Sequence, residues 1–150
     1  MPALTIRPYQ DPDEASEVAL WGELLDDGSP HNDPLTSLRR KLALSRELLF
    51  VALLDDLVVG TAMGGYDVHR GWIYSVAVKP EFQRHGIGTA LIRRVEDDLK
   101  SLGCPKVNLQ IRSSNSGVAG FYQRLGYTVE ERISMGKRLH DRAVPPPSTP

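Results

Sequence analysis

Strand-like and helix-like patterns alternate almost from one end of the chain to the other, without internal repeats. This alternation predicts a single α/β unit. The chain has 150 residues, which suits one domain. A domain of this size buries roughly two-thirds of the surface that its unfolded chain exposes. We therefore expect one folded domain over residues 1–140. Residues 141–150 are rich in proline and carry little to bury, so we expect them to form a disordered tail.

The predicted elements follow from apolar periodicity, capping residues and glycine or proline breaks. In chain order they are a strand at 5–8, helices from 11 to about 25 and from 33 to about 45, strands at 47–54, 57–66 and 71–78, a long helix over 87–102, a strand at 106–111, a helix at 117–125, and one or two strands within 127–138.

The net charge of −1 hides an uneven distribution. Residues 1–33 carry eight acids against one base, for −7, and residues 34–150 carry 17 bases against 11 acids, for +6. A near-neutral total does not suit a general nucleic-acid or membrane-surface binder, so we expect neither partner. The acids of the first part are Asp11, Asp13, Glu14, Glu17, Glu23, Asp26, Asp27 and Asp33.

The single cysteine, Cys104, excludes an internal disulfide and a cysteine-based zinc cluster. The longest apolar run, over residues 48–54, is too short to span a bilayer, and the first residues do not have the pattern of a secretion signal. The sequence therefore predicts a cytoplasmic protein. The four histidines (His31, His69, His85 and His140) lack the spacing of a metal site, so we expect no metal.

The sharpest local feature is the segment between the strand at 71–78 and the long helix. It reads Gln83, Arg84, His85, Gly86, Ile87, Gly88 and Thr89. A helix N-terminus presents free N–H groups and a positive dipole end, and glycines let an anion approach the backbone. A Walker loop would need a Lys after the second glycine, and a dinucleotide fingerprint a third small residue where this chain has Leu91. A loop that only turns the chain explains the glycines equally well.

A second segment, Asn115 to Tyr127, contains Phe121, Tyr122 and Gly126. Together the two segments resemble the GCN5-related N-acetyltransferase (GNAT) superfamily over residues 50–138. The resemblance implies an α/β GNAT fold: a mixed, mostly antiparallel sheet of six to seven strands, splayed at an acetyl-CoA groove and flanked by about four helices. It also implies that residues 83–89 hold the pyrophosphate of acetyl-CoA. Val76, Ala77 and Val78 would hold the pantetheine arm and thioester, and Asn115, Phe121 and Tyr122 would complete the groove.

Further segments, including Val59 to Asp67 and Gly136 to Leu139, resemble the small YpeA-type bacterial acetyltransferases. Residues 111–115 are similar to N-terminal acetyltransferases of the RimI type. Those enzymes carry a glutamate where this chain has Gln110. An amide does not take up a proton at neutral pH, so the resemblance does not transfer that base or that substrate.

Tyr122 is the candidate catalytic acid that the resemblance implies. A thiol of pKa about 8.5 and a tyrosine of about 10 make full proton transfer uphill by about 2 kcal/mol, so a hydrogen bond to the departing thiolate is the better role. A core tyrosine is the alternative. Asp67 and His69 are candidate bases, although a turn-forming Asp and an exposed His are the commoner explanation, and a water chain could also serve.

The sequence thus predicts an acetyl-CoA-dependent N-acetyltransferase that acts directly on a primary amine of a small molecule or protein. The alternative is a non-catalytic acyl-CoA-binding or interaction module on the same fold. A homodimer would be ordinary for such a domain. We also hypothesise that acids among Glu23, Asp26, Asp27 and Asp33 attract a cationic acceptor, the alternative being solvated helix faces.

Overall fold

The computed structural model describes residues 2–139, which fall into two compact units with a boundary between Leu109 and Gln110. The predicted tail at 141–150 and His140 lie outside the described residues.

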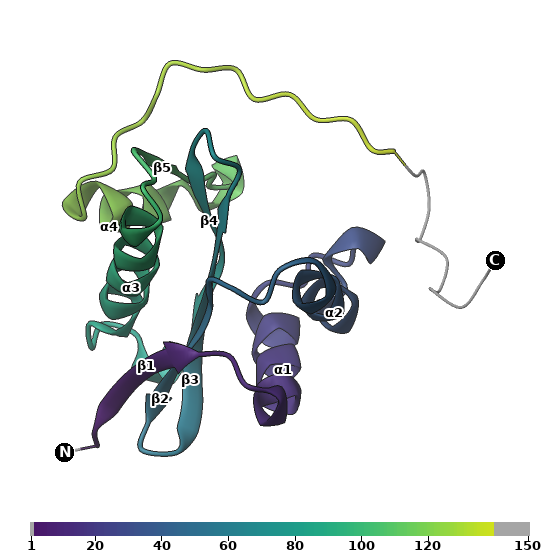
Figure 1. The fold of residues 1–150 in the computed structure, drawn as a ribbon, viewed down its shortest axis with the longest axis vertical. Helices are drawn as coiled ribbons and strands as arrows, with labels where there is room; N and C mark the ends of the chain where they lie inside the picture. Colours follow the sequence, from purple (N-terminus) through teal and green to yellow (C-terminus); the bar gives the residue numbers. More distant parts are fainter. Residues whose placement is uncertain (1, 140–150) are drawn as a thin grey trace. The chain divides into compact units, whose positions relative to one another are not determined.

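The first unit contains a five-stranded sheet in the order β1-β2-β3-β4-β5, together with three α-helices (Figure 1). Strands β1 to β4 pair antiparallel, and β5 pairs parallel with β4. The predicted mixed, mostly antiparallel sheet is therefore confirmed. The elements are β1 (Leu4–Pro8), α1 (Glu14–Leu24), α2 (Pro34–Leu44), β2 (Leu49–Leu54), β3 (Leu57–Tyr66), β4 (Gly71–Val78), α3 (Ile87–Ser101) and β5 (Val107–Asn108).

The sheet is smaller than the predicted six to seven strands. In the described part of the chain, residues 127–138 form no strand, and the predicted strand at 106–111 shortens to Val107–Asn108. Val129 and Ile133 are 81% and 92% exposed. Strand propensity takes effect only where a partner ladder and a buried face are available, and these side chains have no such face.

Acidic side chains organise both helix starts on the N-terminal side. Asp33 precedes α2 and accepts a hydrogen bond from the backbone N–H of Thr36 at 3.0 Å, as the predicted cap requires. The helix predicted from residue 11 instead begins with a 3-10 turn, Asp11–Asp13, ahead of α1. Asp13 stabilises this turn by accepting from the backbone N–H of Gln10 at 2.8 Å and from Arg7 at 2.7 Å.

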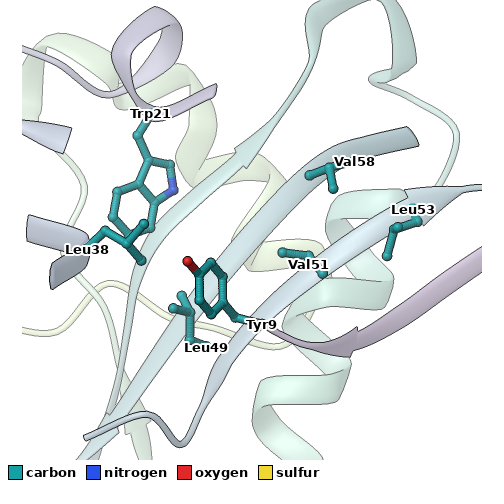
Figure 2. Packing of buried hydrophobic residues seen from close by; sticks show 7 residues of the cluster. All are labelled: Tyr9, Trp21, Leu38, Leu49, Val51, Leu53 and Val58. Carbon is teal, nitrogen blue, oxygen red and sulfur yellow. The ribbon is translucent and has the colours of Figure 1, made fainter. Parts of the chain in front are cut away.

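Helices α1 and α2 cover one face of the sheet and enclose an apolar cluster (Figure 2). Trp21 of α1 and Leu38 of α2 lie beside side chains from β2 and beside Tyr9, which directly follows β1. The buried cluster consists of Tyr9, Trp21, Leu38, Leu49, Val51, Leu53 and Val58. Burial of this apolar surface fixes the two helices on the sheet.

Helix α3 packs on the other face of the sheet, over glycines (Figure 1). A Cβ atom at Gly64 would lie 2.7 Å from the Val95 side chain, and one at Gly71 would lie 2.9 Å from Leu99. These positions admit only glycine without a shift of the helix, because real Cβ atoms do not approach so closely. The close packing fixes α3 against β3 and the start of β4.

Within residues 110–139, the described part of the second unit, the structure has one short α-helix, α4 (Ala119–Arg124), preceded by a 3-10 segment, Ser113–Val118. The helix predicted at 117–125 is therefore shorter than expected. Gly126 follows α4 with φ of +100°, the left-handed conformation that ends many helices. The Gln110 side chain donates a 2.7 Å hydrogen bond to the Ser134 hydroxyl within this unit.

Candidate functional site

Strand β4 has an open edge over most of its length. Strand β5 pairs only with Gly71 and Trp72, so the remainder of β4, up to Val78, lacks a strand partner on that side within the described sheet. The family resemblance implied strands that splay apart here, and the short pairing of β4 with β5 fits that expectation. Backbone N–H and C=O groups along such an edge are free to bind an extended ligand.

A β-bulge lies in the open part of β4. The pairs Thr61 with Ala77 and Met63 with Tyr74 leave one residue of β3, Ala62, facing the two residues Ser75 and Val76. Ser75 has a φ of +51°, which is unusual for a residue other than glycine. Bulges re-aim backbone groups and are common beside active sites. The family resemblance implied roles for Val76, Ala77 and Val78 but none for Ser75.

The predicted anion loop follows directly from β4. A 3-10 turn, Pro80–Phe82, leads into residues 83–86, all of which are exposed. Arg84 and Gly86 have φ values of +66° and +79°. The first turn of α3 has no side-chain cap in the structure, so its N–H groups are not satisfied by a local side chain.

Three side chains of this segment have defined positions. Gln83 donates from Nε2 to the backbone oxygen of Val78 at 3.0 Å, which ties the loop to the end of β4. The His85 ring lies 3.0 Å from the backbone oxygen of Phe82. Ile87 is 2% exposed and anchors the helix start in the core. Gly88 and Thr89 follow in the first turn, half-buried.

Asp67 and His69 lie in the turn between β3 and β4, at the opposite end of β4 from the anion loop. Asp67 Oδ1 accepts hydrogen bonds from the backbone N–H groups of Arg70 at 2.7 Å and His69 at 2.8 Å. These bonds lower the pKa of Asp67, so its carboxylate is ionised and a weaker base. Arg70 Nη2 lies 3.2 Å from His69 Nε2, which must accept because arginine only donates. The turn-forming role of Asp67 fits this geometry.

Tyr122 belongs to α4 of the second unit and sits between two aromatic rings. It makes edge-to-face contacts with Phe121 at 5.0 Å and Tyr127 at 5.8 Å between ring centroids. Burial raises the pKa of Tyr122, which keeps the phenol protonated at neutral pH. A protonated phenol is a hydrogen-bond donor, as the proposed acid requires.

Asn115 is exposed and has a non-helical backbone inside the 3-10 segment. The residue before α4 is Val118, and no side chain caps that helix. The capping role that the sequence left open for Asn115 is therefore not seen in the structure.

Most acids of the N-terminal segment have local structural partners. Arg46 pairs with Asp11 at 2.7 Å, and Arg39 with Glu14 at 3.5 Å. Asp26 and Asp27 each accept a backbone N–H two residues ahead, at 2.8 and 2.9 Å. Glu17 is fully buried. Much of the −7 charge is thus used in turns, caps and ion pairs.

Comparison with known proteins identifies the family. The model described as "Acetyltransferase (GNAT) family" matches residues 17–127. The chain belongs to the GNAT family of acetyltransferases. The matched range contains every predicted site residue and crosses the boundary between the two units.

GNAT relatives cover nearly the whole chain. An acetyltransferase of Yersinia enterocolitica is 42% identical over 136 residues, which are 91% of this chain and 96% of that protein. The Ard1 structure from Thermoplasma volcanium has a TM-score of 0.71 at 25% identity, covering 85% of this chain and 84% of that one. The aminoglycoside N-acetyltransferase AAC(6')-Iy, solved in complex with CoA, has a TM-score of 0.77 at 20% identity, covering 93% and 97%. These matches make the protein an acyltransferase and confirm the fold.

Residues 2–139 contain no group of three or more His, Cys, Asp or Glu side chains that could hold a metal ion. None of the helices described is long and apolar enough to cross a membrane.

Proposed function

We propose that this GNAT protein transfers an acetyl group from acetyl-CoA directly to a primary amine of a small molecule or a protein. The observation that carries the proposal is the continuous run of an open-edged strand, an exposed glycine loop and an uncapped helix start, from β4 to α3.

The residues of this run fit CoA. The uncapped N–H groups at the start of α3 and the exposed Arg84 suit the pyrophosphate, with Gln83, His85, Gly86, Gly88 and Thr89 beside them. The open edge formed by Val76, Ala77 and Val78 suits the amides of the pantetheine arm. Asn115 and Phe121 remain proposed cofactor contacts. The structural relative AAC(6')-Iy was solved with CoA, which supports the same ligand here.

The chemistry requires few protein groups. The bound thioester supplies the acetyl group. A backbone N–H at the bulge of β4 polarises its carbonyl oxygen, and the Tyr122 phenol donates a hydrogen bond to the departing sulfur. A water chain takes the proton from the amine, with His69 and Asp67 as the alternative bases. An α-amine of pKa near 8 already has an appreciable neutral fraction.

We further propose that residues 1–140 act as one GNAT domain, because the family match crosses the boundary at Leu109. A homodimer and a cytoplasmic location also remain predictions. Sedimentation of the purified protein tests the first, and fractionation of the source cell tests the second.

A calorimetric titration with CoA tests the donor assignment, with pantetheine as the matched ligand that lacks the pyrophosphate. We expect CoA to bind much more tightly than pantetheine, and more weakly as salt rises. Equal affinities would contradict the anion site, and no binding of either would contradict the proposed function.

A further inference from the structure

A buried chain of hydrogen bonds runs from α1 through β3 to the bulge of β4. The Trp21 indole donates from Nε1 to the Thr61 hydroxyl oxygen at 2.9 Å. The Thr61 hydroxyl donates to the backbone oxygen of Ser75 at 3.1 Å. Trp21 is 3% exposed and Thr61 is 0% exposed, so no solvent competes for these bonds.

The direction of these hydrogen bonds follows from which groups can donate. An indole N–H can only donate, so the Thr61 oxygen must accept from Trp21. The hydroxyl proton of Thr61 is then left for Ser75, whose carbonyl can only accept. Thr61 is thereby satisfied on both sides, which explains how β3 tolerates a buried hydroxyl among apolar neighbours.

The bond to Ser75 also sets the direction of the next amide. In a planar trans peptide the carbonyl oxygen and the following N–H point in opposite directions. The Ser75 carbonyl points toward Thr61 on β3, so the Val76 N–H points away from β3. That side of β4 is its open edge, because β5 pairs only with Gly71 and Trp72.

We infer that Thr61, held by Trp21, is a positioning residue that locks the Ser75 bulge and thereby aims the Val76 N–H at the acyl carbonyl of the donor. The inference rests on the proposed use of acetyl-CoA. It adds two residues of the apolar layer, one on α1 and one on β3, to the machinery of acetyl transfer.

The bulge needs such a lock because Ser75 has a φ of +51°. Backbone in this region is strained for a residue with a side chain and persists only where neighbours hold it. Without the Thr61 bond, the peptide between Ser75 and Val76 loses the contact that fixes its orientation, and the Val76 N–H turns away from its direction.

Two substitutions of Thr61 distinguish the role of its hydroxyl group from the role of its packing. Thr61→Val keeps the shape and removes the donor, whereas Thr61→Ser keeps the donor. Trp21→Phe removes the indole donor from the other end and serves as a second variant should Thr61→Val fold poorly. Thermal unfolding of each variant reports on its fold, and calorimetry with CoA, which lacks the acyl carbonyl, reports on donor binding.

The deciding readout is the carbonyl resonance of acetyl-CoA labelled with ¹³C at C1, measured on the protein without an acceptor. We expect a downfield shift on the wild-type protein and on Thr61→Ser, and a return toward the free value in Thr61→Val. The rate at which the enzyme hydrolyses bound acetyl-CoA without an acceptor should fall roughly tenfold or more in Thr61→Val, with CoA affinity nearly unchanged.

Equal carbonyl shifts in the wild type and in folded Thr61→Val would overturn the inference and leave the proposed function intact. If Thr61→Val does not fold, equal shifts in the wild type and in folded Trp21→Phe would have the same consequence. A wild-type carbonyl at its free value despite CoA binding would do the same. Absence of CoA binding to the wild-type protein would instead defeat the proposed function itself.

Discussion

Glu17 lies one helical turn after Asp13 on the buried side of α1, yet only Asp13 has partners. Asp13 bonds to Arg7 and to the Gln10 backbone, whereas neither carboxylate oxygen of Glu17 has a hydrogen-bond partner among the described residues. Burial, with a smaller contribution from the Asp13 charge, raises the pKa of Glu17 from 4.5 to about 8.

Glu17 should therefore make the protein less stable as the pH rises. Between pH 4.5 and about 8 the folded protein holds a proton that the unfolded chain has lost. The free energy of unfolding should fall across this window by about 1.4 kcal/mol per pH unit from this group, and level off above it. Glu17→Gln should remove this slope, as measured by chemical unfolding from pH 5 to 9. Glu23→Gln, an exposed change on the same helix, is the control, and a slope equal in all three proteins would contradict the burial argument.

Asp67 should act as a turn anchor. Asp67→Asn keeps an oxygen that can accept the two backbone hydrogen bonds but removes the basic carboxylate. We expect Asp67→Asn to retain turnover and Asp67→Ala to lower the unfolding temperature. If Asp67→Asn instead lost turnover together with the acidic limb of the pH–rate profile, Asp67 would be the base.

Tyr122 should affect turnover more than binding. Tyr122→Phe keeps the edge-to-face ring contacts and removes the hydroxyl. We expect turnover to fall about tenfold or more, with little change in acetyl-CoA affinity. Steady-state kinetics and calorimetry together test this, and unchanged turnover would reduce Tyr122 to a packing residue.

Arg84 should contribute to CoA affinity through charge. Arg84→Ala should weaken CoA binding about fivefold at low salt and flatten its salt dependence, because one cation near the pyrophosphate is lost. Pantetheine affinity should not change. Arg93→Ala, an exposed change farther along α3, provides the matched control, and equal losses in both variants would show that the effect is not local.

The acidic segment should matter for the acceptor if the amine is cationic. The triple change Glu23→Gln, Asp26→Asn and Asp27→Asn should raise the acceptor KM and flatten its salt dependence. Asp33 is left unchanged because its carboxylate caps α2 at Thr36. An unchanged KM would assign these acids to turns and solvated helix faces alone.

Local signals predicted most of the fold. Gly86, Gly103 and Gly126 mark helix ends where they were expected, each with a positive φ. The prediction of one or two strands within 127–138 was wrong, because a strand-like sequence does not by itself supply a partner strand. The burial of Glu17 was not predicted, since no sequence pattern distinguishes it from its half-buried neighbour Glu14.

The candidate site was predicted only in part, because sequence patterns show neighbours along the chain and not contacts between distant residues. The loop over residues 83–89 carries its chemistry in consecutive residues, so the sequence displays it. The bulge at Ser75 depends on Trp21 and Thr61, which are 40 residues apart in the chain. One signal was visible beforehand: a threonine within the apolar strand at 57–66.

The central claim is tested most directly by mass spectrometry of a panel of primary amines incubated with the protein and acetyl-CoA. The panel should span small polyamines, aminoglycosides and peptides with free α-amino or lysine groups. We predict at least one product heavier by a single acetyl group, formed in proportion to enzyme and released with one CoA thiol per acetyl transferred. Tight CoA binding with no acetylated product from any amine would contradict acetyl transfer and favour an acyl-CoA-binding module on the same fold.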